Sequence, residues 1–291
     1  MTIWVVSPML HDTESFERLR AEILQTCAAA GETRPLRFVV IDDSAGTDAE
    51  VRRLDALDDV TVMTPPFNLG HQRAIVYALR ALAPELADDD VVVTMDSDGE
   101  DQPADVPRLL AALDHDQVPL VLAERTKRSE PLSFRLMYLF FRMFFWVLTG
   151  TTVQSGNFAC QRGASLKATI NHPSFDLCYS STLLALRRPT TSVPCARGTR
   201  FAGSSRMNRY SLIAHGIRML LPLSERIAVR FLVLAAASFA ALAALVVLMF
   251  THTVRLTGNT AFVPVTLVVT VLFIVSFVGF VTLFSGLRGQ S

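Results

Sequence analysis

The stretch VVVTMDSDGEDQP, from Val91 to Pro103, decides how the chain is organised. It starts as a short, β-rich apolar run and ends in clustered acids, with Asp96 and Asp98 one residue apart. The proline that follows them is a residue that often opens a helix. This pattern predicts a buried strand that delivers carboxylates to its C-terminal end, which is where open α/β sheets bind ligands.

The two acids are candidate metal ligands. Carboxylates spaced i, i+2 at a strand end can share one hard divalent cation, because such cations take oxygen ligands. Asp96 and Asp98 would then hold Mg²⁺ or Mn²⁺ and leave positions open for the oxygens of a nucleotide diphosphate and for water. An isolated D-x-D pair is more often a solvated acidic turn before a capped helix. The other motifs of this chain favour the metal site.

The C-terminal part of the chain is much more apolar than the rest. Hydrophobic residues make up 51% of the 291 residues, and the mean hydropathy of +0.36 is high for a soluble protein. No charged residue occurs from Phe231 to Phe250 or from Leu256 to Leu287. A helix of about 20 apolar residues crosses a bilayer. We therefore expect two membrane spans, at about 231–251 and 262–284, rather than a buried helical hairpin.

Charge is unevenly distributed although the net charge is zero. From Arg187 to the end there are eleven arginines and one acidic residue, Glu225. Basic residues flank both spans, whereas the segment between them holds only Arg255 and His252. The positive-inside rule then predicts both termini in the cytoplasm. No signal peptide is visible, so we expect a multi-pass protein of the inner (cytoplasmic) membrane whose first two hundred residues remain in the cytoplasm.

The first half of the chain alternates strand and helix patterns. Strands are expected at 3–7, 36–41, 60–63, 91–95 and 119–123, and helices at 13–30, 48–57, 70–82 and 103–113. This order predicts an α/β fold with a mostly parallel, doubly wound sheet covered on both faces. A short strand beginning at Ser155 is expected at the far side of that sheet. The expected divisions are 1–206, an amphipathic interfacial helix at 207–226, and a two-helix transmembrane hairpin at 227–291.

Polar motifs follow two more of the predicted elements. Asp42 and Asp43 end the second strand, where carboxylates can accept hydrogen bonds from a base or a ribose, although Asp-Asp-Ser is also ordinary turn chemistry. Asn68 and Gly70 suit a tight turn into a helix whose N-terminal N–H groups would face an anion. The spacing is neither that of a P-loop nor that of a dinucleotide-binding fingerprint.

Cations follow the acidic motifs. Arg125 comes at the end of the fifth strand, and residues 197–210 form a Gly/Ser-rich segment with four arginines. Guanidinium groups fork onto phosphate oxygens, so this segment, close to the first span, is a candidate site for a phosphate on a lipid. Non-specific attraction to anionic headgroups is the alternative. The aromatic segment 134–148 is expected in the membrane interface or against a partner subunit, with a soluble core helix as the alternative.

The cysteines do not indicate a metal site. Cys27, Cys160, Cys178 and Cys195 lack metal-ligand spacing and are expected to be free thiols. We expect no nucleic acid partner.

Taken in order, the motifs resemble those of family 2 glycosyltransferases. They are Asp42-Asp43-Ser44, Asn68-x-Gly70-His71-Gln72-x-Ala74, Asp96-x-Asp98-x-x-Asp101-x-Pro103, Ser155-Gly156-Asn157-Phe158 and Arg200-x-x-Gly203-Ser204-Ser205-Arg206. The most similar branch is that of the polyprenyl-phosphate and dolichol-phosphate hexose transferases with a two-helix C-terminal anchor. The resemblance covers nearly the whole chain, and five motifs in register are hard to obtain by chance.

The resemblance implies a GT-A catalytic domain over 1–206, a UDP- or GDP-linked sugar donor, a polyprenyl phosphate acceptor and inversion at the anomeric carbon. It assigns Asp96 and Asp98 to Mg²⁺ or Mn²⁺, and it allows a homo-oligomer, either a dimer or a tetramer. The implied donor-binding residues are Pro8, Asp42, Asp43, Asn68, Gly70, Gln72 and Asp96. The implied catalytic residues are Asp98, Asp101 and Arg125, and the implied ligands of the acceptor phosphate are Arg125, Asn157, Arg200, Ser204 and Arg206.

The sequence departs from the family pattern in three places. The usual opening Pro-x-Tyr-Asn-Glu is here PMLHD at 8–12, and the usual Leu-Gln after the second metal acid is Gly99-Glu100. Asn157 stands where an acid, sometimes assigned as a base, is common, and an amide cannot take a proton at neutral pH. A phosphate monoester is already mostly ionised near pH 7, so this change favours a lipid phosphate as acceptor. For a hydroxyl acceptor, Asp98 or Asp101 could serve as the base.

Other functions remain open. The chain could transfer sugar to another lipid, such as diacylglycerol or a sphingolipid, or could be a non-catalytic membrane-anchored scaffold that retains the fold. A processive polysaccharide synthase is disfavoured, because neither Trp4 nor Trp146 follows an arginine as in the Gln-x-x-Arg-Trp motif. Two spans also form no channel for a growing glycan, and they line no pathway for a lipid flippase without oligomerisation.

Overall fold

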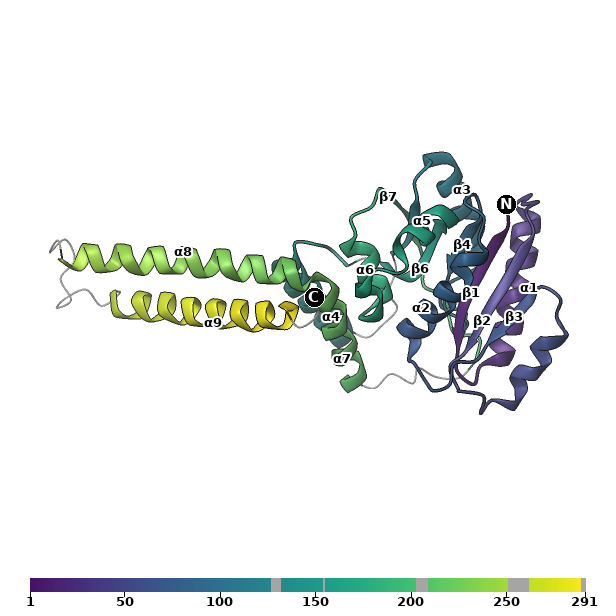
Figure 1. The fold of residues 1–291 in the computed structure, drawn as a ribbon, viewed down its shortest axis with the longest axis horizontal. Coiled ribbons are helices and arrows are strands. Elements are labelled where there is room, and N and C mark those ends of the chain that lie inside the picture. Colours follow the sequence, from purple (N-terminus) through teal and green to yellow (C-terminus); the bar gives the residue numbers. More distant parts are fainter. Residues whose placement is uncertain (127–131, 154, 203–208, 251–261, 289–291) are drawn as a thin grey trace. The chain divides into compact units, whose positions relative to one another are not determined.

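The computed structural model describes residues 1–126, 132–153, 155–202, 209–250 and 262–288 (Figure 1). Its strands are β1 (Ile3–Met9), β2 (Leu36–Asp42), β3 (Val60–Met63), β4 (Val91–Thr94), β5 (Leu120–Arg125), β6 (Ser155–Arg162) and β7 (Thr190–Cys195). Its α-helices are α1 (Thr13–Ala29), α2 (His71–Leu82), α3 (Val106–Asp116), α4 (Leu132–Thr149), α5 (Gly163–Thr169), α6 (Tyr179–Ala185), α7 (Arg209–Leu220), α8 (Ser224–Phe250) and α9 (Phe262–Arg288). The chain divides into a first unit, Met1–Arg142 with Thr152–Pro222, and a second unit, Met143–Thr151 with Leu223–Ser291.

A seven-stranded sheet organises the first unit. Its strand order is β3-β2-β1-β4-β6-β5-β7. β1 pairs in parallel with β2 and β4, β2 with β3, and β5 with β7. Val91, Val92 and Val93, in β4, are completely buried, as expected for a strand that is covered on both faces of the sheet. The predicted α/β fold with a mostly parallel sheet is confirmed.

β6 runs against its neighbours. It is inserted between β4 and β5 and is antiparallel to both. The expectation of a short strand at the far side of the sheet is therefore wrong. Phe158, Ala159 and Cys160 are all buried, which fits a strand inside a covered sheet. The sequence pattern indicates a strand here, but its neighbours depend on contacts with segments distant along the chain.

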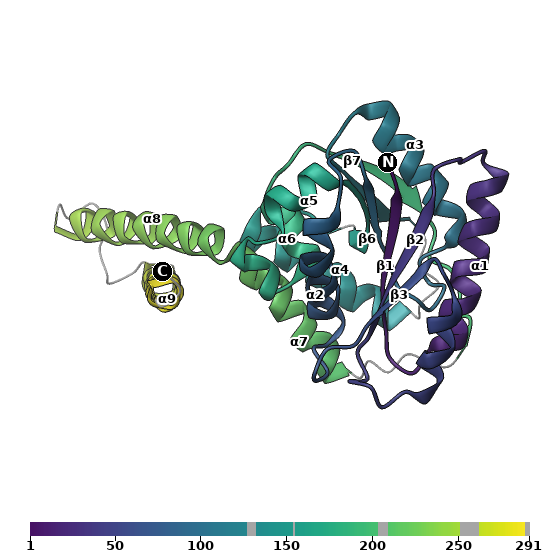
Figure 2. The ribbon, with the colours of Figure 1, turned by 45° about the vertical axis from the view of Figure 1, so that its right-hand side comes forward.

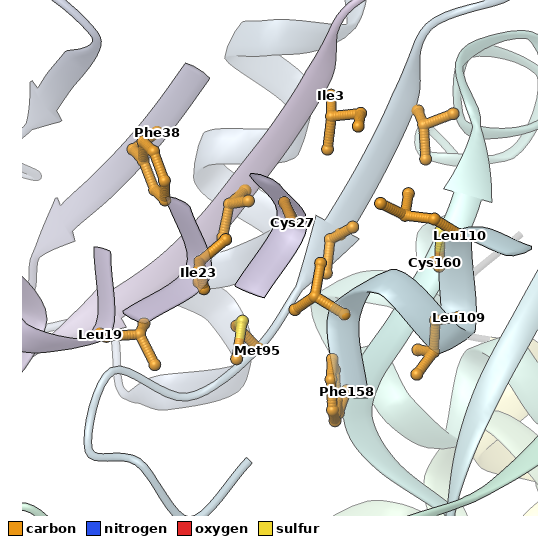
Figure 3. Close-up of a cluster of buried hydrophobic side chains, with 14 of the residues drawn as sticks. Ile3, Leu19, Ile23, Cys27, Phe38, Met95, Leu109, Leu110, Phe158 and Cys160 are labelled. Atoms are coloured by element: carbon orange, nitrogen blue, oxygen red, sulfur yellow. The ribbon is translucent and has the colours of Figure 1, made fainter. Parts of the chain in front are cut away.

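Helices cover both faces of the sheet (Figure 2). On one face, α1 and α3 pack on the strands through residues such as Leu19, Ile23 and Leu109 (Figure 3). On the other face, α2, α5 and α6 form a second core. Side chains alternate along β1 between the two, because successive residues of a strand point to opposite faces: Ile3 joins the first core and Val6 the second. All four cysteines are free and buried, as predicted.

The sheet brings distant segments to one edge. β1, β2, β4, β5 and β7 run in the same direction, so their C-terminal ends lie together, and the antiparallel β6 begins there. We call this side the carboxyl edge. It receives the segments that follow Met9, Asp42, Thr94, Arg125 and Cys195, which contain most of the predicted site residues.

The last helix of the first unit is amphipathic. Gly216 of α7 lies against the ring of Phe141 in α4, where a Cβ would approach the ring to 3.0 Å. α7 also exposes Tyr210, Ile213 and Ile217, which are spaced as one helical stripe. This exposed apolar stripe precedes the apolar C-terminal helices in the sequence.

Two long apolar helices make up most of the second unit. α8 and α9 pack side by side in opposite directions: Phe239 and Phe273 have ring centroids 5.9 Å apart, and Gly279 lies beneath Phe231. The helical segments Tyr210–Leu248 and Val263–Ser285 are long and apolar enough to cross a membrane, judged by length and composition. The predicted pair of long apolar C-terminal helices is confirmed.

Candidate active site

Acidic side chains gather just beyond β4. The chain turns through Asp96, Asp98 and Asp101, whose side chains are 18%, 11% and 4% exposed. The backbone N–H of Asp96 donates to Oδ2 of Asp101 at 3.1 Å and so closes the turn. The negative charge of Asp96 raises the pKa of both other acids, after the larger effect of burial. The three carboxylates therefore form one electrostatically coupled cluster at the carboxyl edge.

Asp96 is held by residues from two other elements. Nδ2 of Asn157, in β6, donates to Oδ1 of Asp96 at 2.8 Å. Nε2 of His71, the first residue of α2, lies 2.9 Å from the same oxygen. Burial lowers the pKa of His71, but Asp96, with Asp101 and Asn157, raises that pKa to about 9. Burial in turn raises the pKa of Asp96, but His71, with Arg125 and Asn157, leaves that pKa below its usual range. His71 is thus protonated and Asp96 ionised at neutral pH.

The other two acids face guanidinium groups. Burial and then Asp96 raise the pKa of Asp98 to about 6, and Nη2 of Arg200 lies 3.0 Å from its Oδ2. Burial and then Asp96 raise the pKa of Asp101 to about 7, and Nη2 of Arg125 lies 3.6 Å from its Oδ1. Arg125 is the last residue of β5, and Arg200 lies in the segment that follows β7, so both cations reach the acids from the carboxyl edge. The site therefore combines carboxylates and cations in one small region.

Asp98 and Asp96, the two candidate metal ligands, each have part of their carboxylate engaged: on Asp98, Oδ1 accepts from the N–H of Glu100 at 2.9 Å and Oδ2 faces Arg200. Burial and then the charge of Asp96 raise the pKa of Asp98, and a cation beside this carboxylate would favour its ionised form. On Asp96, Oδ1 already has two partners, and Oδ2 takes part in neither contact. Among the described residues, no group of three or more His, Cys, Asp or Glu side chains could hold a metal ion. The protein would thus supply one or two carboxylate oxygens, the usual number where phosphates complete the coordination of Mg²⁺.

Asp42 and Asp43 support neighbouring loops. Asp42 is 1% exposed, and its two oxygens accept from the N–H groups of Ser44 and Gly46. Asp43 accepts from the N–H groups of Leu69 and Gly70 at 2.7 and 3.0 Å. Each carboxylate oxygen thus already has one backbone partner, and each keeps a second lone pair for a ligand. Their predicted contact with a nucleotide stays a prediction.

Asn68 and Gly70 shape the turn into α2. Nδ2 of Asn68 donates to the carbonyl of Asp43, and its Oδ1 accepts from the N–H of Gly70 at 3.1 Å. Gly70 has φ of +77°, in the left-handed region that favours glycine. This turn aims the first residue of α2, His71, at the acidic cluster.

Pro8 and Gln72 lie beside the site in different ways. The carbonyl oxygen of Pro8 accepts from the hydroxyl of Ser97 at 3.0 Å, which ties the end of β1 to the acidic turn. Oε1 of Gln72 accepts from the backbone N–H of Ser180 at 3.0 Å and so braces the start of α6. Of the remaining predicted residues, Ser204 and Arg206 lie outside the described residues.

Two residues important for the geometry were not among the predicted site residues. His71 stands in the quoted Asn-x-Gly-His motif, and its position at a helix start after a glycine turn was the available signal. Tyr179 gave no signal in the sequence: its buried hydroxyl contacts Oγ1 of Thr94 at 3.1 Å and Nε2 of Gln161 at 3.1 Å. Thr94 donates in turn to the carbonyl of Asn157 at 2.6 Å. This network fixes β6 beneath the acidic cluster.

The fold of this chain is similar to that of several solved structures. The glucosyl-3-phosphoglycerate synthase of Mycobacterium tuberculosis, in complex with Mn²⁺, UDP and glucosyl-3-phosphoglycerate, is 19% identical, with a TM-score of 0.49 over 78% of this chain and 80% of that one. The same enzyme with Mg²⁺ and UDP is 18% identical, with a TM-score of 0.48 over 78% and 79%. TarS 1–349 of S. aureus is 16% identical, with a TM-score of 0.40 over 80% and 66%.

A comparison with curated proteins finds no significant match. A sequence model of the family described as Glycosyl transferase family 2 matches residues 14–175, which is more than half of the chain. The matched residues include the acidic turn after β4, the turn before α2 and the whole of β6. The chain therefore belongs to glycosyl transferase family 2 and is a glycosyltransferase that uses nucleotide sugars.

Proposed function

We propose that the protein transfers a hexose from a UDP- or GDP-linked donor to a polyprenyl phosphate at the cytoplasmic face of the membrane, with inversion at the anomeric carbon. In this proposal, residues 1–206 form the catalytic domain, 207–226 an interfacial helix and 227–291 the membrane anchor. The exposed apolar stripe of α7, formed by Tyr210, Ile213 and Ile217, supports an interfacial position for this helix. A helix that exposes one apolar face binds at a bilayer surface.

Asp96 and Asp98 would together carry the donor's metal. When bound, Mg²⁺ or Mn²⁺ supplies positive charge to the donor diphosphate, which favours its departure. The proposed donor-binding residues are Pro8, Asp42, Asp43, Asn68, Gly70, Gln72 and Asp96. His71 keeps Asp96 ionised and oriented through the hydrogen bond to Oδ1.

The hydrogen bond from Asn157 to Asp96 is the observation that carries the choice of acceptor. Asn157 donates its amide to a carboxylate, so it is engaged as a donor and cannot act as a base. An acceptor that arrives already ionised needs no base at this position. A phosphate monoester meets that requirement near pH 7, whereas an alcohol does not.

The cations suit such an acceptor. Arg200 and Arg125 lie beside Asp98 and Asp101, close to where the donor diphosphate would sit. One guanidinium group can donate two parallel hydrogen bonds to a phosphate. These arginines can therefore hold the acceptor phosphate despite its repulsion by the acids. Asn157, Ser204 and Arg206 complete the proposed acceptor set.

The proposed reaction is an in-line displacement. An oxygen of the lipid phosphate attacks C1 of the sugar, and the bond between C1 and the diphosphate oxygen breaks. The nucleoside diphosphate leaves with the bonding electron pair, and the configuration at C1 is inverted. The product is a hexosyl phosphopolyprenol.

The experiment is to incubate membranes containing the full-length protein with labelled UDP- and GDP-hexoses and a polyprenyl phosphate, and to analyse the lipid extract by mass spectrometry. We expect one hexose on the lipid phosphate, abolished by chelation of divalent metal. Asp98→Asn should lower the rate about 10²- to 10³-fold by removing charge without changing shape. The exposed acid Asp55 provides the matched control, Asp55→Asn, which should react as the wild type does.

A second candidate function has one observation in its favour. Asp101, with a pKa raised to about 7, has a basicity suited to a general base for a hydroxyl acceptor. Its side chain is only 4% exposed, however, and is engaged with the Asp96 N–H. Adding diacylglycerol or a ceramide in place of polyprenyl phosphate separates the two functions. Label on the lipid alcohol but never on lipid phosphate would refute the proposed acceptor.

A further inference from the structure

We infer that Phe201 and Gly99 form a lock that positions Arg200 beside the acidic cluster. Phe201 and Gly99 are positioning residues in this inference, because they act through Arg200 and not on a substrate. The inference rests on the proposed function for one step, the binding of the acceptor phosphate by Arg200. The lock itself is a property of the first unit and can be tested without any substrate.

Backbone and side-chain hydrogen bonds join residues 196–201, which we call the strap, to the acidic turn. The N–H of Phe201 donates to the carbonyl of Asp98 at 2.8 Å, and the N–H of Gly198 donates to the carbonyl of Glu100 at 2.8 Å. Nε2 of Gln102 donates to the carbonyl of Ala196 at 2.6 Å. The strap thus runs beside the acidic turn and is hydrogen-bonded to it at three points. These bonds fix the path of its backbone.

Glycines allow this close approach. Gly99 has φ of +84°, and a Cβ on it would lie 2.7 Å from the ring of Phe201. A Cβ on Gly198 would lie 2.5 Å from the carbonyl oxygen of Gly99. Contacts this short do not occur for real Cβ atoms, so a larger residue at either position would push the strap away. The ring of Phe201 therefore fills space that a side chain at position 99 would otherwise occupy.

The other side of the ring is covered by α1. Cζ of Arg18 lies 4.2 Å from the ring centroid of Phe201, which is a cation–π contact. Arg18 is itself held by Glu22 through a hydrogen bond of 2.8 Å. Phe201 is thus enclosed between the acidic turn and α1. Residues from three distant parts of the sequence meet at this one side chain.

The departure from the family motif at 99 and 100 now has a physical explanation. Gly99 makes room for Phe201, and Glu100 forms an ion pair with Arg197 of the strap. Both changed residues contact the strap. Together, Gly99 and Glu100 attach the strap, which carries Arg200, to the acidic turn.

The lock acts on Arg200 because Arg200 directly precedes Phe201 in the chain. With the backbone of Phe201 bonded to Asp98, the side chain of Arg200 reaches Oδ2 of the same aspartate at 3.0 Å. Nε of Arg200 is buried and has no hydrogen-bond partner among the described residues. This buried donor is available to an anion that enters the site. The strap backbone on either side of Arg200 sets the direction in which this N–H group points.

The first test uses the detergent-solubilised full-length protein without substrate. Trypsin cleaves after Arg197 and Arg200 only when the strap leaves the turn, and mass spectrometry identifies new amino termini at positions 198 and 201. Phe201→Ala should increase the cleavage rate about tenfold, because a half-buried aromatic side chain is lost. Phe201→Leu should restore much of the protection. Arg52→Ala, which removes an exposed arginine elsewhere, is the control and should leave the rate unchanged.

The second test asks whether the lock positions Arg200. With polyprenyl phosphate as acceptor and a UDP- or GDP-hexose that supports turnover, Phe201→Ala should raise the acceptor KM several-fold and leave the donor KM unchanged. Arg18→Lys keeps the charge on the surface of α1 and weakens the contact with the ring. It should raise both the cleavage rate and the acceptor KM about twofold, without risk to folding.

A double-mutant comparison isolates the contact between the ring and residue 99. Gly99→Ala alone introduces both the clash with the ring and the strain of a positive φ. In the Phe201→Ala background the clash is absent, so the added effect of Gly99→Ala on the cleavage rate should be smaller than in the wild type. Equal effects in the two backgrounds would contradict contact at this point.

The outcomes separate the lock from the proposed function. Unchanged cleavage in Phe201→Ala and Arg18→Lys would overturn the lock. Faster cleavage with an unchanged acceptor KM would show that the lock does not position Arg200, and would overturn the inference. If Arg200→Ala itself leaves the acceptor KM unchanged, the proposed acceptor site fails, and the proteolysis still reports on the lock. Faster cleavage together with a raised acceptor KM supports the inference.

Discussion

The three acids of the β4 turn have different surroundings. Asp96 has a protonated histidine and an amide on one oxygen, whereas Asp98 and Asp101 have raised pKa values and one arginine each. The same residue type therefore has two kinds of role: Asp96 is ionised and oriented, and Asp98 pairs with Arg200 and accepts from the N–H of Glu100. Asn157 supports the first role as a donor, which an acid at that position could not do when ionised.

His71 should matter for activity although it donates to Asp96 and not to a reacting atom. A hydrogen bond to a charged group contributes about 1.5–3 kcal/mol, so His71→Ala should lower kcat/KM roughly 10- to 100-fold. Steady-state kinetics with the donor and polyprenyl phosphate measure this. The exposed His115 provides the control in His115→Ala, since its ring pairs with Asp116 and not with one of the three acids of the β4 turn. Equal activity of both variants would contradict the role of His71.

The cysteines should be unreactive in the folded protein. Burial, followed by Glu32, raises the pKa of Cys27 to about 11, and burial raises that of Cys195 to about 12. At pH 8 these thiols stay protonated and enclosed, and only the thiolate reacts. A disulfide reagent such as DTNB should therefore react slowly with the native protein and rapidly with all four cysteines in denaturant. A rapid burst of four thiols from the native protein would contradict this.

At the scale of elements, the site depends on how β6 is inserted. β6 lies between β4 and β5 and begins at the carboxyl edge, which puts Asn157 beside Asp96. Gly156 leaves space for Arg125, whose Nη2 would lie 3.0 Å from a Cβ at that position. Because β6 is antiparallel, the residues at its start lie at the carboxyl edge. In a parallel strand, the residues at the end would lie there instead.

Tyr179 should stabilise this arrangement. Its hydroxyl joins α6 to β4 and β6 through Thr94 and Gln161, and the side chain is completely buried. Tyr179→Phe removes the partner of the buried Nε2 of Gln161 and should lower the free energy of unfolding by about 1–3 kcal/mol. Thermal unfolding followed by circular dichroism measures the loss. Tyr77→Phe is the matched control, because Tyr77 is exposed on α2 and should tolerate the change. Equal thermal midpoints for both variants would contradict the role of this network.

At the scale of the whole molecule, a catalytic unit and an apolar helical pair share one chain. Within the second unit, Nη1 of Arg230 donates to the carbonyl of Val147, at the C-terminal end of α4. Cations are favourable at that end of a helix, because its carbonyl groups carry partial negative charge. Arg230 thus has a partner inside its own unit, as well as the topological role proposed for it.

The proposed topology puts both termini in the cytoplasm. Arg218, Arg226 and Arg230 precede the first span, whereas Arg255 lies between the spans. A green fluorescent protein fused to the C-terminus should fluoresce, and an alkaline phosphatase fused there should be inactive. The same pair of reporters inserted after residue 257 should give the opposite result. Phosphatase activity at the C-terminus would contradict the proposed topology.

Much of this protein could be predicted from local patterns. The alternation of apolar runs and amphipathic segments indicated the α/β fold, and the length of the apolar C-terminal segments indicated two long helices. The acids at 96, 98 and 101 were identified because they directly follow a buried run. Each of these signals lies within a short window of sequence, where periodicity and composition determine what forms.

The sequence by itself determined the elements of the fold, the acids and arginines available to the site, and the apolar character of α8 and α9. Only the tertiary structure decided that β6 enters the middle of the sheet, that His71 and Asn157 occupy one oxygen of Asp96, and that Phe201 rests on Gly99. The physical reason is that these contacts join residues far apart along the chain. Strand order and side-chain packing fix them together, and no local pattern records which distant residue will be the partner.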